Sequence, residues 1–339
     1  MVESSRRFLA ALSALLPALL CLSCGNDGPA PDAPLGPGPL GDPAWTWENP
    51  LAAGHDLLAV WSGRNLAFAV GRGGVLLRYR DGAWTRTASG VDTDLEGIHG
   101  NANGDVFTVG QAGHVLGWNG SDWAAADSVT AVDLHDVWVS DAGDVFCVGE
   151  GGLVLQANDP LHGGAWSATN LEPAVGLQAV WGSAANDVYA AGIAGITFHF
   201  DGAAWRAIDT GNTLRVTDIW GTGKDDVFLV GESGSIFHFD GKRWAEMASG
   251  TPFNLHCIAG RSATDVYAAG LGSSILHFDG HGWTSTVRDG FSTLFGITVS
   301  DLGATAVGAV GIILERERRR LPGSGRRNPR GICGAFGRD

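Results

Sequence analysis

Histidines and aspartates recur at fixed spacing along the chain, and these are the residue types that could do chemistry. His199, His238 and His277 lie 39 residues apart, and imidazoles are common zinc ligands. Because they hold one place in three successive repeats, they are too far apart to share an ion with bonds of about 2 Å. A matching carboxylate opens one strand of each repeat, at Asp105, Asp144, Asp187, Asp226 and Asp265. We expect these aspartates to cap backbone N–H groups in local turns, and we expect no metal or cofactor.

Tryptophans form a second series that could bind a ligand. Four of them end the first strand of a repeat, at Trp61, Trp138, Trp181 and Trp220. If the repeats form a ring, these positions converge near its axis. The indoles could then form an aromatic collar at a channel mouth and stack on sugars or on peptide aromatics. They could equally pack between neighbouring repeats, and both interpretations remain open.

A repeat that fills the middle of the chain must position these residues. A Val-Gly or Ala-Gly pair ends an apolar run at intervals of 38 to 43 residues, at Gly71, Gly110, Gly149, Gly192, Gly231, Gly270 and Gly308. A Trp that follows a Gly turn keeps the same spacing, at Trp84, Trp123, Trp166, Trp205, Trp244 and Trp283. Both markers share a period of 39 residues and the same four-residue insertion, so they report one structural repeat.

The clearest copy of the repeat contains four short strands, at residues 216–221, 226–231, 235–239 and 244–247. Its second strand is apolar on both faces, which is typical of a strand that is covered on both sides. Four strands in about 39 residues is the size of a propeller blade. In a propeller each blade lies between two others, so burial of both faces is expected.

The ring can be closed by the two ends of the repeat region. The seventh repeat stops at Leu314, before its outer strand. Trp47 precedes Leu58 by 11 residues, which is the spacing between the outer Trp of one repeat and the Leu that begins the next. We therefore predict an all-β, seven-bladed propeller with four antiparallel strands per blade over residues 44–314. The N-terminal strand around Trp45–Trp47 closes its last blade and removes the open edge.

The composition agrees with this fold and excludes other classes. The 339 residues include 52 Gly and 13 Trp, and only 17% are charged, which does not suit a helical bundle. A hydrophobic content of 45% excludes disorder for the bulk of the chain. The net charge of −14 has the wrong sign for phosphate contact, so we expect no nucleic-acid partner.

The pattern resembles bacterial exported β-propellers of the broad sialidase-repeat and photosystem-assembly-factor type. The elements that carry the resemblance are Trp220-Gly221, Asp226-Val227-Phe228 and His238-Phe239-Asp240-Gly241. It covers about residues 44–314 and is a resemblance of architecture. The Trp-Asp ending of WD repeats, the Gly-Gly signature of kelch repeats and the Ser-x-Asp-x-Gly-x-Thr-Trp box of sialidases are missing.

The N-terminus has the pattern of an export signal. Arg6 and Arg7 precede an apolar run that is short for a membrane span. Residues 21–25 resemble a bacterial lipoprotein processing site, in which Ser23 precedes the lipidated Cys24, although Cys21 stands where Leu is usual. We expect a signal peptide at 1–23 and a Pro- and Gly-rich tether at 24–43. Ordinary secretion without a lipid anchor is the alternative.

Two further segments differ from the repeat. The loop at 158–164 replaces a short turn in the third blade, and we expect it on the face opposite the turns between second and third strands. The tail at 315–339 holds eight Arg against three acidic residues. It could be a basic arm that grips an acidic partner or envelope phosphates. We expect a disordered extension, because no periodicity supports a fold there.

Loops on the rigid scaffold are the best candidates for binding. The turns between second and third strands vary between blades, and from them we select a candidate binding rim of Arg72, Gln111, Glu150 and Glu232. Catalysis finds little support, since the three Tyr fall at repeated apolar positions and no nucleophile elbow, Walker loop or His-Glu-x-x-His motif is present.

The sequence as a whole predicts a monomeric, non-catalytic binding scaffold in the bacterial cell envelope. A lipid anchor would be its only membrane contact, and a protein or a glycan its partner. An envelope glycosidase or lyase with its site at the channel mouth is one alternative. An assembly factor for an envelope complex is another.

Overall fold

The structure, a computed structural model, describes residues 45–47, 54–63, 66–126, 130–286, 292–300 and 303–317. Seven four-stranded antiparallel sheets are arranged in a ring and form a seven-bladed β-propeller, as the sequence predicted. The expected signal peptide, Cys24, the tether and the tail beyond residue 317 lie outside these ranges. Within the ranges, no helix is long and apolar enough to cross a membrane.

The blades are numbered in chain order, and their strands are given from the channel outward. Blades 1 to 3 are β2 (Leu57–Ser62), β3 (Ala67–Gly71), β4 (Leu76–Arg80) and β5 (Ala83–Thr87); β6 (Leu95–Gly100), β7 (Val106–Gly110), β8 (Val115–Trp118) and β9 (Trp123–Ala125); β10 (Leu134–Val139), β11 (Asp144–Gly149), β12 (Leu153–Asn158) and β13 (Trp166–Asn170). Blades 4 to 6 are β14 (Leu177–Ala184), β15 (Asp187–Gly192), β16 (Thr197–Phe200) and β17 (Trp205–Ala207); β18 (Val216–Gly223), β19 (Asp226–Gly231), β20 (Ile236–Phe239) and β21 (Trp244–Glu246); β22 (Leu255–Ser262), β23 (Asp265–Gly270), β24 (Ile275–Phe278) and β25 (Trp283–Thr286).

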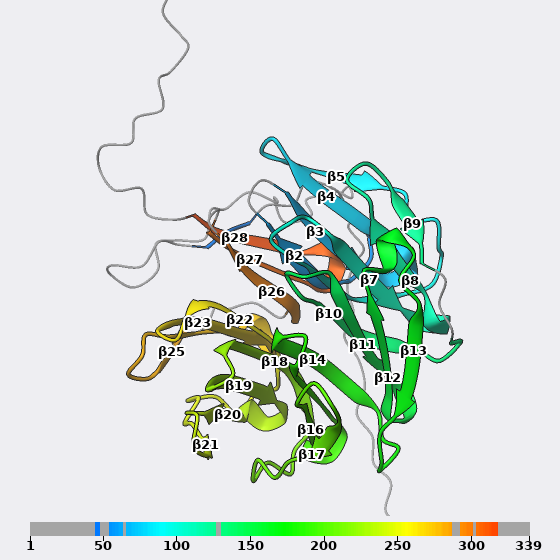
Figure 1. Ribbon diagram of the computed structural model, residues 1–339. Coiled ribbons are helices and arrows are strands. Elements are labelled where there is room, and N and C mark those ends of the chain that lie inside the picture. The colour runs from blue at the N-terminus through cyan, green and yellow to red at the C-terminus, as the bar shows by residue number, and fades with distance from the viewer. Residues whose placement is uncertain are drawn as a thin grey trace, which may run out of the picture. The chain divides into compact units, whose positions relative to one another are not determined.

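Blade 7 combines both ends of the repeat region, as predicted. It consists of β26 (Leu294–Ser300), β27 (Gly303–Gly308), β28 (Ile313–Glu317) and β1 (Thr46–Trp47). β1 is antiparallel to β28, with Thr46 opposite Glu315. In Figure 1 the orange strands of this blade lie beside the blue strands of blade 1. β28 continues to Glu317, which is beyond the blade end at Leu314 that the sequence predicted.

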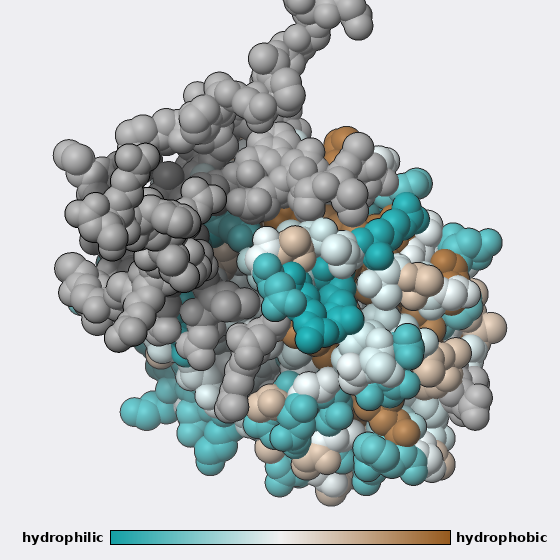
Figure 2. Space-filling view, turned by 90° about the horizontal axis from the view of Figure 1, so that it is seen from above, coloured by the Kyte–Doolittle hydropathy of each residue, from teal (hydrophilic) through white to brown (hydrophobic). Residues whose placement is uncertain are grey.

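The core lies between neighbouring blades. Second strands such as β7 are buried along their whole length, which confirms the burial expected of a strand covered on both faces. Phe68, Phe107, Phe146 and Phe228 occupy the same place in four second strands and are fully buried. Each packs on residues of the adjacent blade, as Phe146 packs with Val180 and Val188. The face seen in Figure 2 mixes hydrophilic and intermediate residues with small, separate hydrophobic patches.

Short 3-10 turns join second and third strands on one face of the ring, which we call the turn face; the links between blades lie on the same face. These turns are η1 (Arg72–Gly74), η2 (Gln111–Gly113), η3 (Glu150–Gly152), η5 (Ile193–Gly195), η6 (Glu232–Gly234), η7 (Leu271–Ser273) and η8 (Ala309–Gly311). In four of them the second N–H donates to an Asp or Asn that precedes the next blade; for example, Gly73 N donates to Asp94 Oδ1 at 2.8 Å. These hydrogen bonds therefore connect neighbouring blades at the turn face.

The glycine that ends each second strand is required by close backbone contact. A Cβ on Gly231 would lie 2.0 Å from the carbonyl oxygen of Arg215, and the equivalent glycines meet the same obstacle. This explains why Gly recurred at this position as the clearest marker of the repeat.

The remaining turn, η4 (Pro160–His162), belongs to the four-residue insertion. It follows the end of β12 and lies on the face opposite the turn face, as predicted. Leu161 packs into the space left by Gly117 on β8, since a Cβ at Gly117 would lie 2.6 Å from Leu161 Cδ2. The insertion in blade 3 thus packs against blade 2.

The repeated histidines and aspartates bind one another within single blades. His238 Nε2 lies 2.6 Å from Asp226 Oδ1, and the ring stacks on Phe228 with centroids 4.1 Å apart. The same pair joins His199 to Asp187 and His277 to Asp265. The capping role predicted for the aspartates is wrong, because their carboxylates accept hydrogen bonds from side chains. In blade 3 it is Ser140 Oγ that accepts from the backbone N–H of Asp144.

Candidate functional site

A channel of about 310 Å³ runs through the ring and is lined by the first strands of the blades. Every first strand has a bulge at its second residue, where the pairing register with the next strand shifts. A bulged residue does not pair regularly with the neighbouring strand, and its side chain therefore points in a different direction. These seven residues form a mouth ring at the turn face, consisting of Leu58, Glu96, His135, Gln178, Thr217, His256 and Phe295.

The mouth ring was not predicted from the sequence. Leu57 pairs with Gly71 as Leu134 pairs with Gly149, so Leu57 is the true start of the first strand and Leu58 belongs to the ring. The only available signal was variation, because the position after the leading Leu or Val differs in nearly every blade. Periodicity reveals positions where the same residue type recurs, so it does not reveal a position whose residue type changes from blade to blade.

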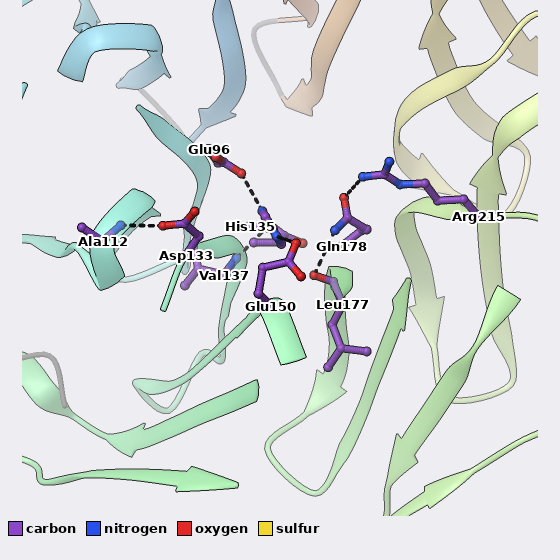
Figure 3. A network of polar contacts seen from close by, with 10 residues as sticks. Glu96, Ala112, Asp133, His135, Val137, Glu150, Leu177, Gln178 and Arg215 are labelled. Carbon is purple, nitrogen blue, oxygen red and sulfur yellow. Dashed lines mark hydrogen bonds and ion pairs between the residues drawn. The ribbon is translucent and has the colours of Figure 1, made fainter. Parts of the chain in front are cut away.

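His135 lies at the centre of the charged side of the mouth. Its Nδ1 is 2.6 Å from Glu96 Oε2 and its Nε2 is 3.0 Å from Glu150 Oε1, so both ring nitrogens face a carboxylate (Figure 3). Burial favours the neutral ring, but the hydrogen bonds and charges of the two glutamates outweigh it and raise the pKa of His135. Donation from both nitrogens requires the imidazolium, which joins blade 2 to blade 3.

Arg215 lies across the mouth from this histidine. It precedes β18 at a place where four other blades carry an Asp or Asn, and its guanidinium donates to Gln178 Oε1 in the neighbouring blade (Figure 3). Burial, with the positive charge of Arg215, lowers the pKa of His256 on the next blade. Glu232 lines the same part of the mouth. The ring therefore combines fixed charges of both signs with apolar Leu58 and Phe295.

Two partly buried carboxyl groups line the channel just inside the mouth. Asp136 accepts hydrogen bonds from Val137 N at 2.8 Å and from Val180 N of the next blade at 2.9 Å. Asp218 is held in the same way, with Ile258 N at 2.7 Å. Burial raises the pKa of Asp136 to about 7, against the opposing effect of its two N–H donors. Burial, together with the charge of Asp136, also raises the pKa of Asp218.

The predicted rim residues are all on the turn face, but they differ in what they reach. Glu150 binds His135 and Glu232 lines the mouth, so these two belong to the site. Arg72 instead forms an ion pair with Asp56, with Nε 3.0 Å from Oδ2. Gln111 begins η2, where its carbonyl oxygen lies 2.9 Å from His114 Nδ1.

The predicted aromatic residues lie at the other end of the channel. They come at the fifth residue of first strands that start at the turn face, so they surround the opposite mouth. Trp61 Nε1 donates to Gly100 O of the next blade at 2.8 Å, and Trp61 is 9% exposed. Trp138, Trp181 and Trp220 pack on the equivalent glycines of their neighbours. This contact favours the packing interpretation, and the rim and the tryptophans do not form one site.

The sequence matches no protein-family model and no curated protein. Its backbone is similar to solved propellers. A structure of YCF48 bound to D1 peptide superposes with a TM-score of 0.64 at 17% identity, over 80% of this chain and 95% of that chain. YCF48 from Cyanidioschyzon merolae gives 0.66 at 16% identity, over 81% and 99%. The WD40 propeller domain of Doa1 gives 0.68 at 11% identity, over 80% and 96%. These similarities support the propeller fold.

Proposed function

We propose that this protein is a non-catalytic binding scaffold of the cell envelope that holds a segment of a partner protein at the turn-face mouth. The observation that carries the proposal is the mouth ring. Seven equivalent bulges on a repeated framework present chemically different side chains around one opening. Variable groups on a rigid scaffold are the usual form of a recognition site.

A protein segment fits this mouth better than a glycan. The four tryptophans that could stack on sugars lie at the opposite mouth and pack on glycines of the next blade. At the turn face the groups are carboxylates, imidazoles, amides, a guanidinium, Leu58 and Phe295, which match the mixed chemistry of a peptide. The fold similarity to YCF48, a propeller whose structure has been solved with a bound peptide, supports the same interpretation and its assembly-factor variant.

The sequence suggests how the scaffold is held in the envelope. A lipid on Cys24 would anchor it, and the Pro- and Gly-rich residues 24–43 would serve as a tether.

Crosslinking in intact cells tests this proposal. Phe295 in the mouth ring is replaced by the photoreactive benzoylphenylalanine, which keeps an aromatic ring at that position. Thr264, exposed on the opposite face, is replaced in the same way as the control. We expect a discrete protein adduct from position 295 only, identified by mass spectrometry. Adducts from position 264 alone, or none from either position, would contradict the proposal.

A further inference from the structure

The exposed large hydrophobic side chains all lie on one face of the propeller. Among the described residues they are Val132, Ile193, Leu214, Phe253, Leu271 and Val310. Three of them stand in links between blades, two residues before a first strand, and three stand in the turns η5, η7 and η8. Links and turns both belong to the turn face, so these apolar side chains lie on the same face as the mouth that carries the proposed binding site.

Five of these side chains follow one another around the ring from blade 4 to blade 7. Ile193 and Leu214 flank the junction of blades 4 and 5, and Phe253 precedes blade 6. Leu271 and Val310 are in the turns of blades 6 and 7, and Val310 is 73% exposed. Phe295 of the mouth ring extends the apolar surface inward on blade 7. We call these six residues the apolar arc.

The mouth that the arc partly borders is lined by carboxylates. Glu96 and Glu150 both lie against His135, so the three groups carry at least one net negative charge whether or not the ring is protonated. Glu232 adds a second carboxylate at the mouth. Among the described residues of the turns and links, Arg72 is paired with Asp56, while Arg215 donates to the uncharged amide of Gln178. Carboxylates therefore dominate the mouth beside an apolar arc.

We infer that the partner segment carries apolar and basic side chains together, with the apolar ones on the arc and a Lys or Arg at Glu96, Glu150 and Glu232. The inference rests on the proposed function and adds the chemistry of the ligand. Charge complementarity selects this occupant over the two others that an apolar surface could receive. An anionic membrane would be repelled by the carboxylates, and a second copy would bring the same acidic mouth against itself.

Peptide selection on the full mature protein tests this inference. A random twelve-residue library displayed on phage is selected against the immobilised protein, and binders are synthesised for titration calorimetry. We expect the selected peptides to combine apolar residues with Lys or Arg. We also expect Phe253→Ala to weaken them by about tenfold or more, since a buried aromatic anchor dominates such contacts. Glu232→Gln should weaken them by roughly threefold to tenfold, and increasingly less as salt is raised.

Matched controls keep the test specific. Val132→Ala removes a similarly exposed side chain outside the arc, and Glu246→Gln makes the same charge change on the outer strand β21. Both should leave affinity within about twofold. Selected peptides without basic residues, or peptides indifferent to Phe253→Ala, would overturn the inference. Binding to phosphatidylglycerol vesicles or self-association, either of them lost in Phe253→Ala, would overturn it too.

The two proposals fail in different ways. Peptides that compete with the crosslink from position 295 but are acidic or uniformly apolar would leave the binding scaffold standing and refute the ligand chemistry. If no peptide is selected and position 295 gives no adduct, the binding scaffold itself is refuted.

Discussion

Replacement of Asp136 by Asn should change how the stability of the propeller depends on pH. Asp136 is partly buried at the wall of the channel, and its removal from bulk water raises its pKa to about 7 from an ordinary value near 3.8. Between these two pH values the folded protein keeps a proton that the unfolded chain releases. Stability is therefore highest in acid and is lost as the pH rises through the folded pKa.

The size of the effect follows from that difference in pKa. About three pKa units at 1.36 kcal/mol each correspond to roughly 4 kcal/mol of unfolding free energy lost between pH 4 and pH 9. Asn cannot ionise, so the variant lacks this loss. Its amide can accept from only one of Val137 N and Val180 N, which leaves one buried N–H unpaired at a cost of about 1–3 kcal/mol. The variant should be the less stable protein at pH 4.5 and the more stable one at pH 9.

Urea unfolding followed by tryptophan fluorescence at pH values from 4.5 to 9 measures this crossing. Asp218→Asn is the matched variant, since Asp218 bridges blades 5 and 6 in the same way. Its pKa is also raised by burial, and the charge of Asp136 adds to the effect. The double variant should therefore have the flattest profile. If Asp136→Asn runs parallel to the wild type at every pH, the carboxyl group is not held protonated by burial and the argument is wrong.

Three other predictions concern separate parts of the molecule. Gly231→Ala should cost a few kcal/mol, seen as a melting temperature lower by about 5–10 °C, because its Cβ would meet a backbone oxygen. Gly223→Ala, with open space around it, should change little, and equal effects would refute the contact. His135→Gln should be more destabilising at pH 6 than at pH 9, because an imidazolium with a raised pKa stabilises the fold below that pKa and is lost above it; an equal loss at both pH values in urea unfolding would contradict this. Leu161→Ala should lower stability by about 1–3 kcal/mol without changing the crosslink from position 295, and loss of that crosslink would make the insertion a partner contact.

The sequence by itself determined the architecture. Spacing of Gly and Trp is a local property of each blade, and the same backbone contact at Gly231 and its equivalents enforces it seven times. Closure by the strand at Trp45–Trp47 was predicted correctly because an unpaired strand edge is unfavourable. The spacing used for it was off by one residue, since blade 1 begins at Leu57 and Leu58 is its bulged second residue. The apolar second strands followed from the need to cover both faces of a blade.

Only the tertiary structure decided which residues share a site. The alternation along a regular strand predicts which face a side chain lies on, but a bulge changes the direction of the side chain. The bulges place His135 and Phe295 at the mouth. The direction of the first strands separated Trp61 from Glu150 by the length of the channel. The repeated Asp–His pairs and the bond between His135 and Glu96 join residues 12 and 39 positions apart. Such contacts depend on how strands and blades lie side by side, and the local pattern of the chain does not contain that information.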